Sequence, residues 1–397
     1  MIKNHIFLTV ILIACITGFS SDIYTPSMEA IAKSLNTSIS NIQRSMSLFM
    51  VAVAISQLIY GPLSEVYGRK KPLILGSFFT FLGSILCIFA PNIELLFLGR
   101  IMQGLGCGSF SALWRPIFRD VLTPNQIAIY GGYVGIAMVF IVGFAPTLGG
   151  YLEFFFHWKG SFIIIAAYSI LLFFLISFLL PETNIHHKRE RLKFYFFKKS
   201  FLELLKSPLF MGYSFCVFLT YGSFFSWFVV SPKVLMVSYN LTPQEFGLTS
   251  LFISASSMSL AGIFNAKILK IKNKHFMLNL GWSLIFISGF IFFLSQYLQI
   301  NNLYQVITYG FIFLFGSTLI WPNSFSGAFA PFGHIAGYAS ALYSFMQLLG
   351  GSVISFFITL LNLESLISLS LTLIITSLMS FLFFNLLILP KETNKIG

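Results

Sequence analysis

Long apolar stretches, each about as long as a membrane-spanning helix, alternate with short polar stretches along the whole chain. About 20 apolar residues in a helix cross the ~30 Å hydrocarbon core of a bilayer. These stretches are continuously apolar, whereas the strands of a membrane barrel alternate between apolar and polar residues. The pattern therefore predicts an all-α membrane protein with twelve transmembrane helices. The predicted helices are 6–24, 42–62, 72–90, 94–114, 126–150, 160–180, 208–230, 244–266, 276–297, 304–322, 337–360 and 366–389.

The positive charges lie mostly on one side of this predicted topology. If residue 1 is placed in the cytoplasm, 19 of the 24 lysines and arginines fall in cytoplasmic segments. Basic loops are retained on the cytoplasmic side of a membrane, so we expect both termini in the cytoplasm and the protein in the cell inner (plasma) membrane. The net charge of +12 is then a topology signal with some contact to anionic membrane lipids, and it does not indicate nucleic acid binding.

Composition excludes a soluble protein and offers no metal site. Charged residues make up 9% of the chain and apolar residues 57%, against about 25% charged residues in a soluble domain. The histidines are scattered and no pair of cysteines has metal-ligand spacing, so we expect buried, inert thiols. The four cysteines are Cys15, Cys87, Cys107 and Cys216.

Two similar halves are indicated by short repeats. "LLPETN" (179–184) ends the first half and "ILPKETN" (388–394) ends the second, and a Gly-Gly pair occurs in the fifth span of each half. We expect an N-terminal six-helix half (1–181), a basic cytoplasmic linker (182–207) and a C-terminal six-helix half (208–397). A solvated linker with an amphipathic interfacial helix within 192–206 is expected. Two such halves rock around a site near the membrane midplane.

Two charged residues fall inside predicted spans, where an ionisable group is costly and is a functional hypothesis by default. Asp22 lies towards the outer half of the first span, and Arg100 lies within the fourth, one turn before Gln103. Desolvation favours a neutral carboxyl group and a nearby arginine favours a charged one, so Asp22 could load and release a proton. The alternative is that Asp22 caps the helix before Pro26 and faces water.

Five segments along the chain carry recognisable motifs. They are "SDIYTPSMEAIAKSL" (21–35), "QLIYGPLSEVYGRKKPL" (57–73), "LGRIMQGLGCG" (98–108), "GFAPTLGGYL" (143–152) and "WPNSFSGAFAPFGHIAGYASALYSFMQLLGG" (321–351). Taken in order, they resemble the major facilitator superfamily, and within it the drug/proton antiporters of the Bcr/CflA (bicyclomycin and chloramphenicol resistance) type. The resemblance covers nearly the whole chain.

The resemblance implies roles for these residues. It implies proton coupling by Asp22 with Arg100 as its electrostatic modulator. The fifth-span motif is associated with antiport, although small residues there also allow ordinary tight helix packing. Gating on the cytoplasmic side is implied for Gly61, Glu65, Gly68, Arg69, Lys70 and Asp120, and antiport for Gly143, Pro146, Gly149 and Gly150.

The loop motif departs from the family pattern in two places. Glu65 replaces a common aspartate, and Val66 stands where an arginine is common. The missing arginine could weaken the gating contacts or shift them to Arg69 and Lys70. The alternative is that the loop cations only set the topology.

Mixed aromatic and amide side chains suit a cavity for amphipathic organic molecules. The candidates are Tyr24, Gln57, Gln103, Trp114, Tyr133, Tyr221, Trp227, Trp321, Asn323, Tyr343 and Gln347. No phosphate-binding loop is present and "GLGCG" (104–108) lacks the strand-turn-helix context of a dinucleotide site. We therefore expect a monomeric transporter without cofactor or enzyme activity. It would use the proton gradient to export small amphipathic compounds; the alternatives are export of one endogenous metabolite, such as a siderophore, or nutrient import.

Overall fold

The computed structural model describes residues 4–122, 124–184, 194–300, 302–332, 335–360 and 366–390, and within these ranges it contains helices and no strand. The chain separates into two compact units. Unit 1 comprises Met1–Phe197 and Thr242–Leu248, and unit 2 comprises Lys198–Leu241 and Thr249–Gly397. The domain boundaries expected from the sequence stay a prediction.

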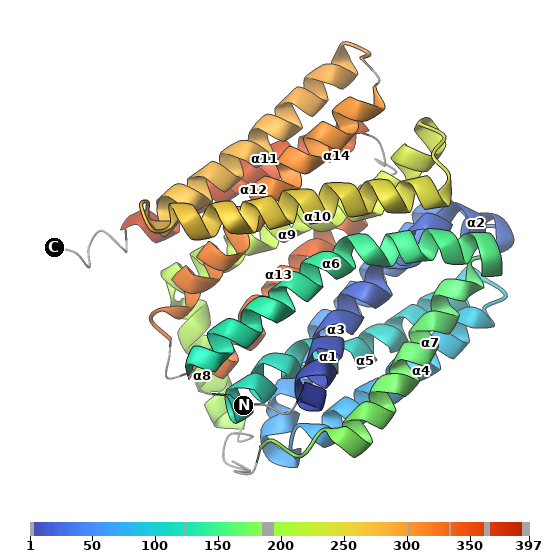
Figure 1. Ribbon diagram of the computed structural model, residues 1–397. Helices are drawn as coiled ribbons and strands as arrows, with labels where there is room; N and C mark the ends of the chain where they lie inside the picture. The colour runs from blue at the N-terminus through green and yellow to red at the C-terminus, as the bar shows by residue number, and fades with distance from the viewer. Residues whose placement is uncertain are drawn as a thin grey trace. The chain divides into compact units, whose positions relative to one another are not determined.

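Unit 1 is built from long helices with short caps and turns between them (Figure 1). Its elements are α1 (Asn4–Asp22), η1 (Thr25–Ser27), α2 (Met28–Ser34), α3 (Ile39–Tyr67), α4 (Lys70–Ile88), α5 (Ile93–Val121), α6 (Pro124–Phe156), α7 (Lys159–Phe174) and the π-helical turn η2 (Leu175–Leu179). Side chains that accept from an otherwise unpaired backbone N–H start two of the helices. Ser38 Oγ accepts from Asn41 N (3.2 Å) before α3, and Asn92 Oδ1 accepts from Leu95 N (3.0 Å) before α5.

Unit 2 repeats this construction (Figure 1). Helix α8 (Phe194–Lys206) belongs to it from Lys198 on. The elements that follow are α9 (Pro208–Pro232), η4 (Lys233–Ser238), α10 (Pro243–Ile268), α11 (Lys274–Tyr297), α12 (Leu303–Phe329), α13 (Ala336–Leu360), α14 (Leu366–Phe383) and η6 (Phe384–Ile388). The start of α10, up to Leu248, is part of unit 1. Three helix starts are again capped by side chains, at Ser207, Asn273 and Asn302.

The two units share their internal packing scheme. In unit 1, α4 packs against α5 and α7, while α1 packs against α5 and α6. In unit 2, the helices at corresponding positions form the same pairs: α11 packs against α12 and α14, while α9 packs against α12 and α13. The repeated pairing confirms the two pseudo-symmetric halves that the sequence repeats predict.

Eleven helices of the described ranges are long and apolar enough to cross a membrane, and they match eleven of the twelve predicted stretches. Helix α5 covers the remaining one, predicted at 94–114, but its composition is too polar for it to count among the eleven. The reason lies in its place within unit 1. It packs against both α3 and α4, so its polar residues and glycines face other helices in place of lipid.

The predicted linker is only partly described. Residues 185–193 lie outside the described residues, and α8 occupies most of the remainder, which agrees with a helix within 192–206. Its first three residues, 182–184, are not a solvated tether. They bind the loop between α3 and α4, as described next.

Candidate functional site

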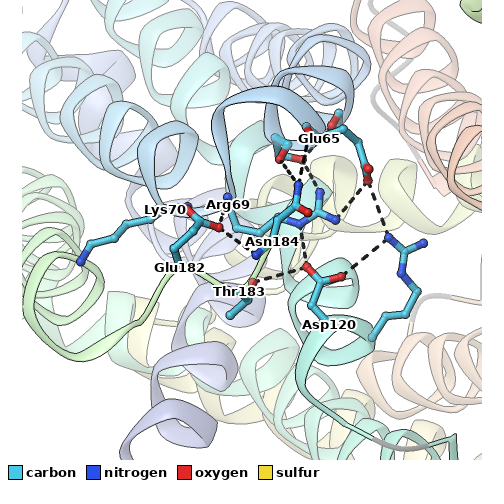
Figure 2. A network of polar contacts seen from close by, with 10 residues as sticks. Glu65, Arg69, Lys70, Asp120, Glu182, Thr183 and Asn184 are labelled. Atoms are coloured by element: carbon cyan, nitrogen blue, oxygen red, sulfur yellow. Dashed lines mark hydrogen bonds and ion pairs between the residues drawn. The ribbon is translucent and has the colours of Figure 1, made fainter. Parts of the chain in front are cut away.

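The loop motif folds around the side chain of Arg69, which is 2% exposed (Figure 2). Arg69 lies between the end of α3 and the start of α4, and its donors point to three different partners. Nε donates to Asp120 Oδ2 (2.9 Å), Nη2 to Glu65 Oε1 (3.0 Å) and Nη1 to Ser64 Oγ (2.6 Å). Arg119 adds a looser ion pair to Glu65 Oε1 at 3.6 Å. We call the residues gathered here the Arg69 network.

Electrostatics keep Arg69 charged. Burial opposes its charge, but the hydrogen bond and charge of Asp120, followed by those of Glu65, raise the pKa of Arg69 above its ordinary value. Because the pKa of Arg69 is raised, the stabilisation that comes from its positive charge is lost only when the pH rises into the strongly alkaline range. The guanidinium therefore does not titrate under physiological conditions.

The segment 182–184, at the end of unit 1's last span, closes the network from the other side (Figure 2). The carboxylate of Glu182 accepts from two backbone N–H groups at the start of α4: Arg69 N donates to Oε1 (2.8 Å) and Lys70 N to Oε2 (3.2 Å). Asn184 Nδ2 donates to two carbonyl oxygens at the end of α3, those of Ser64 (3.1 Å) and Glu65 (3.2 Å). Glu182 thus satisfies orphan donors at the positive end of one helix, and Asn184 satisfies orphan acceptors at the negative end of another.

Sequence reasoning missed Ser64, Glu182 and Asn184 as members of this site. The segment "PETN" (181–184) does contain a usable signal. It follows a span that ends on the same side as the polar loop, and its carboxylate and amide can bind the unpaired backbone groups at helix ends. Lys70, which was predicted for the gate, uses its ammonium elsewhere: Nζ donates to the Ser177 carbonyl (2.7 Å).

The two glycines of the loop motif differ in what their backbone requires. Gly68 has φ +84°, a conformation that side chains rarely adopt, and an added Cβ would overlap the Glu182 carboxyl group. A Cβ at Gly61 would meet nothing within 4 Å. Gly61 takes part only through its carbonyl oxygen, which accepts from Ser64 Oγ (2.7 Å). Backbone geometry therefore explains Gly68 and leaves Gly61 without a comparable constraint.

A second polar cluster surrounds Arg100 in the interior of unit 1. Arg100 is fully buried, and the faces of its guanidinium lie against two rings, with Cζ 4.5 Å from the centroid of Tyr24 and 4.2 Å from that of Phe49. Nη1 donates to the carbonyl oxygen of Ser20 (3.0 Å) and to Gln103 Oε1 (2.7 Å). Nε and Nη2 are buried without a hydrogen-bond partner.

Asp22 belongs to the same cluster and does not face water. It is 7% exposed, and Ser21 Oγ donates to its Oδ1 (2.5 Å). Arg100 contacts the segment on both sides of Asp22, at the Ser20 carbonyl oxygen and at the Tyr24 ring, but its side chain and that of Asp22 do not form an ion pair within 4.0 Å. The structure therefore brings together the two residues predicted for proton coupling, with Gln103 and Tyr24 beside them, and leaves two arginine donors uncommitted.

The glycines of the predicted antiporter motif let α6 approach other parts of unit 1. A Cβ at Gly149 would overlap the carbonyl oxygen of Ile23, directly after Asp22. A Cβ at Gly150 would overlap the carbonyl oxygen of Pro243, in the 242–248 segment of the same unit. Gly143 accepts at its carbonyl from Thr147 Oγ1 (2.9 Å), next to Pro146. The motif is thus a close-packing surface of α6.

Five of the predicted cavity residues lie in unit 1. Tyr24, Gln57 and Gln103 are buried, and Trp114 is 9% exposed with Arg115 over its ring at 4.3 Å. Tyr133 is 54% exposed and packs edge-on against the ring of Phe7. Tyr24 and Gln103 both contact Arg100, and the role of the five residues as cavity lining stays a prediction.

The other predicted cavity residues lie in unit 2 and are mostly engaged in packing. The Trp227 ring packs at Gly310 and Phe313, the buried Asn323 donates through Nδ2 to Asn265 Oδ1 (2.8 Å), and Tyr343 packs edge-on against Phe325 and Phe329. Tyr221 and Trp321 belong to an aromatic cluster with Phe224, their ring centroids 6.1 Å apart. Gln347 is half-buried.

Comparison with known families decides the classification. The sequence model of the Major Facilitator Superfamily matches residues 10–355. The chain belongs to the major facilitator superfamily. The fold agrees: a peptide transporter, POT, solved with sulfate superposes on this superfamily member with a TM-score of 0.74 at 12% sequence identity, covering 96% of this chain and 94% of that one.

Curated relatives of this major facilitator chain are transporters and drug-resistance proteins. An uncharacterized MFS-type transporter, YdgK, of Bacillus subtilis is 30% identical over 87% of this chain and 86% of its own length. The bicyclomycin resistance protein homolog of Haemophilus influenzae is 24% identical over 90% and 89%, and multidrug resistance protein D of Escherichia coli is 23% identical over 88% and 87%. These relatives confirm the resemblance to the Bcr/CflA type. The protein is a multi-pass membrane transporter and not an enzyme.

Proposed function

We propose that this transporter exports small amphipathic compounds from the bacterial cytoplasm in exchange for protons, by alternating access across the inner membrane. The names of its relatives support a resistance role, since two of them are a bicyclomycin resistance protein homolog and a multidrug resistance protein. The distribution of lysines and arginines supports cytoplasmic termini.

The observation that carries the proposal is the arrangement of Arg100 and Asp22. A fully buried guanidinium with two unpaired donors is costly in a membrane protein. Stacking on Tyr24 and Phe49 offsets part of that cost, by roughly 2 kcal/mol for a desolvated cation on an aromatic face. Arg100 thus keeps hydrogen-bond donors free beside the carboxyl group of Asp22. Such donors can bind the carboxylate when Asp22 is ionised and release it when Asp22 is protonated.

Proton exchange at Asp22 would supply that changing charge. An ionised Asp22 attracts Arg100 and a protonated one does not, so each proton bound or released changes the balance of forces between α1 and α5. One proton moving down a potential of 100 mV yields about 2.3 kcal/mol. A few kcal/mol are enough to move a two-state equilibrium from one side to the other.

The Arg69 network would hold the loop between α3 and α4 in a fixed form while the transporter changes state. Glu65, Arg69, Lys70 and Asp120 would then contribute to the cytoplasmic gate through this loop. Losing one partner of a buried ion pair costs several kcal/mol because the other charge stays behind unpaired. The network would therefore keep the loop between α3 and α4 rigid, so that the loop can contribute to closure of the cytoplasmic gate.

Replacing Asp22 tests the proton-coupled mechanism. We expect Asp22→Asn to abolish bicyclomycin transport driven by a pH gradient in everted membrane vesicles, because the amide cannot take up a proton. Equilibrium binding of bicyclomycin should persist. Glu29→Gln, which removes an acid of an exposed ion pair with Lys33, is the matched control and should transport normally. Gradient-driven transport by Asp22→Asn at the unsubstituted rate would contradict the role of Asp22.

A further inference from the structure

A second acidic residue of unit 1 lies on the close-packing face of α6. Glu153 follows Gly149 by one helical turn, and His157 lies just after the end of α6 at Phe156. Residues four apart, such as Gly149 and Glu153, lie on the same face of a helix. Burial decreases towards this end of α6: Gly149 is buried, Glu153 is half-buried and His157 is exposed. Glu153 thus lies between the interior of unit 1 and its surface.

The carboxyl group of Glu153 lies beside the hydroxyl group of Ser27. Ser27 is fully buried, and neither its Oγ nor Glu153 Oε2 has a hydrogen-bond partner in good geometry. The Ser27 hydroxyl can donate to an ionised carboxylate, and its oxygen can accept from the O–H of a protonated one. The pair can therefore form a hydrogen bond in either protonation state of Glu153.

The same buried segment connects Glu153 to Asp22. Ser27 is five residues after Asp22, and the residues between them, 23–26, are buried. Thr25 Oγ1 donates to the Asp22 carbonyl oxygen (2.7 Å), and Gly149 brings α6 against Ile23. Asp22 therefore begins a short buried segment, 22–27, and the carboxyl group of Glu153 lies beside the last residue of that segment, Ser27.

Several titratable groups belong to the elements around Glu153. His157 follows just after the end of α6, and Glu245 lies two residues after Pro243, which lies against Gly150. Of the elements packed against α6, η1 has no titratable side chain. The others carry His5, Cys15 and Asp22 (α1), Glu94, Arg100, Cys107, Arg115, Arg119 and Asp120 (α5), and Lys159 and Tyr168 (α7). No described residue forms an ion pair with Glu153.

We propose that Glu153 is a second proton-binding group of this transporter and the entry point for the proton that reaches Asp22. In this step the O–H bond of protonated Glu153 breaks, an O–H bond forms on the Asp22 carboxylate, and Glu153 takes another proton from water on the His157 side. The proposal rests on the proposed proton exchange. It assigns the entry to the end of α6 that lies far from the Arg69 network, because α6 begins just after α5 ends beside Asp120.

The test measures proton binding first, without any substrate. The full-length protein in lipid is titrated while infrared difference spectroscopy follows the C=O stretch of protonated carboxyl groups. Glu153→Gln should lose one titrating signal that Glu153→Asp retains, and Asp22→Asn should lose a different one. Glu29→Gln should lose neither. An unchanged titration in Glu153→Gln would overturn the proposal, and if that variant does not fold, an unchanged titration in Ser27→Ala would do so.

Transport by the same variants separates this proposal from the proposed function. With bicyclomycin as the probe, Glu153→Gln should lose its response to an imposed pH gradient and keep exchange of bicyclomycin across the membrane without a gradient. Loss of both activities with a normal titration would indicate a structural role and overturn the proposal. If the unsubstituted protein ignores the gradient, the proposed function fails, while the carboxyl titration still decides whether Glu153 binds a proton.

Discussion

The two buried arginines of unit 1 are held in opposite ways. Arg69 uses Nε, Nη1 and Nη2, and its partners include two carboxylates. Arg100 has partners only at Nη1, and its Nε and Nη2 are buried without a hydrogen-bond partner. A guanidinium with satisfied donors is fixed in place, whereas one with free donors can change partners. This difference is the physical basis for giving Arg69 a structural role in the gate and Arg100 a role in the transport cycle.

Gly68 gives a prediction at the scale of one residue. Gly68→Ala should lower the stability of the protein by about 1–3 kcal/mol, because a side chain is strained at φ +84° and its Cβ would displace the Glu182 carboxylate. A lower melting temperature in detergent, measured by intrinsic fluorescence, would show this. Gly61→Ala is the matched control, since its Cβ meets nothing within 4 Å. Equal melting temperatures for the two variants would contradict the assignment.

Contacts between two side chains of the candidate site could be predicted from the sequence, whereas hydrogen bonds from a side chain to the backbone could not. Glu65, Arg69 and Asp120 could be named because the loop motif resembles that of the family, in which an acid and an arginine make charge contacts on the cytoplasmic side. The contacts of Glu182 were not found because its partners are the N–H groups of Arg69 and Lys70, which every residue except proline carries. No sequence pattern marks which backbone donors a carboxylate will reach across 113 residues.

At the scale of the element, α5 explains why hydropathy alone is an incomplete guide. The apolar stretches predicted twelve helices, and eleven helices of the described ranges are apolar enough to count as membrane spans, because lipid-facing surfaces must be apolar. Helix α5 is flanked by α3 and α4, and its glycines allow the close approach. Gly106 lies against Gly76 and Thr80 of α4, while Gly104 lies against Phe49 of α3. The helix was still predictable from its length. That its glycines would contact two different helices was not predictable, because it depends on which helices lie next to α5.

The glycine contacts of α5 can be tested directly. Gly106→Ala should destabilise the protein by about 1–3 kcal/mol, since the added Cβ would overlap Thr80 and the Gly76 carbonyl oxygen and force α4 and α5 apart. Gly135→Ala on α6, where nothing lies within 4 Å of the added Cβ, is the control and should not be destabilised. Thermal unfolding in the same detergent compares the two. A stable Gly106→Ala variant would mean that the α4–α5 contact adjusts without cost.

At the scale of the whole molecule, the sequence predicted two halves from short repeats, and the packing pairs of the two units repeat each other. The repeats could not predict which residues bind a substrate. Trp227, Asn323 and Tyr343 have the right chemistry for a cavity, yet they are engaged in contacts within unit 2. Aromatic and amide side chains serve packing and binding equally well, so their type does not separate the two uses.

The proposed orientation can be checked in intact cells. We expect a cysteine at the exposed Lys33 to react with a membrane-impermeant maleimide from outside, and a cysteine at the exposed Lys272 to react only after lysis, because basic loops stay in the cytoplasm. The four native cysteines are buried and free, so the unsubstituted protein serves as the blank. The opposite labelling pattern would reverse the proposed direction of transport.

The attachment of 182–184 to backbone groups has a consequence for sequence variation. Glu182 and Asn184 hold the loop through N–H and C=O groups, and these do not change when the side chains at the same positions do. The loop can therefore accept unusual residues, such as Val66 where the family commonly has an arginine, without losing its anchor. A substitution such as that at Val66 leaves this main-chain anchor intact, whereas the anchoring residues have no such substitute. Variation should therefore be tolerated at position 66 and be restricted in the inconspicuous "ETN" (182–184).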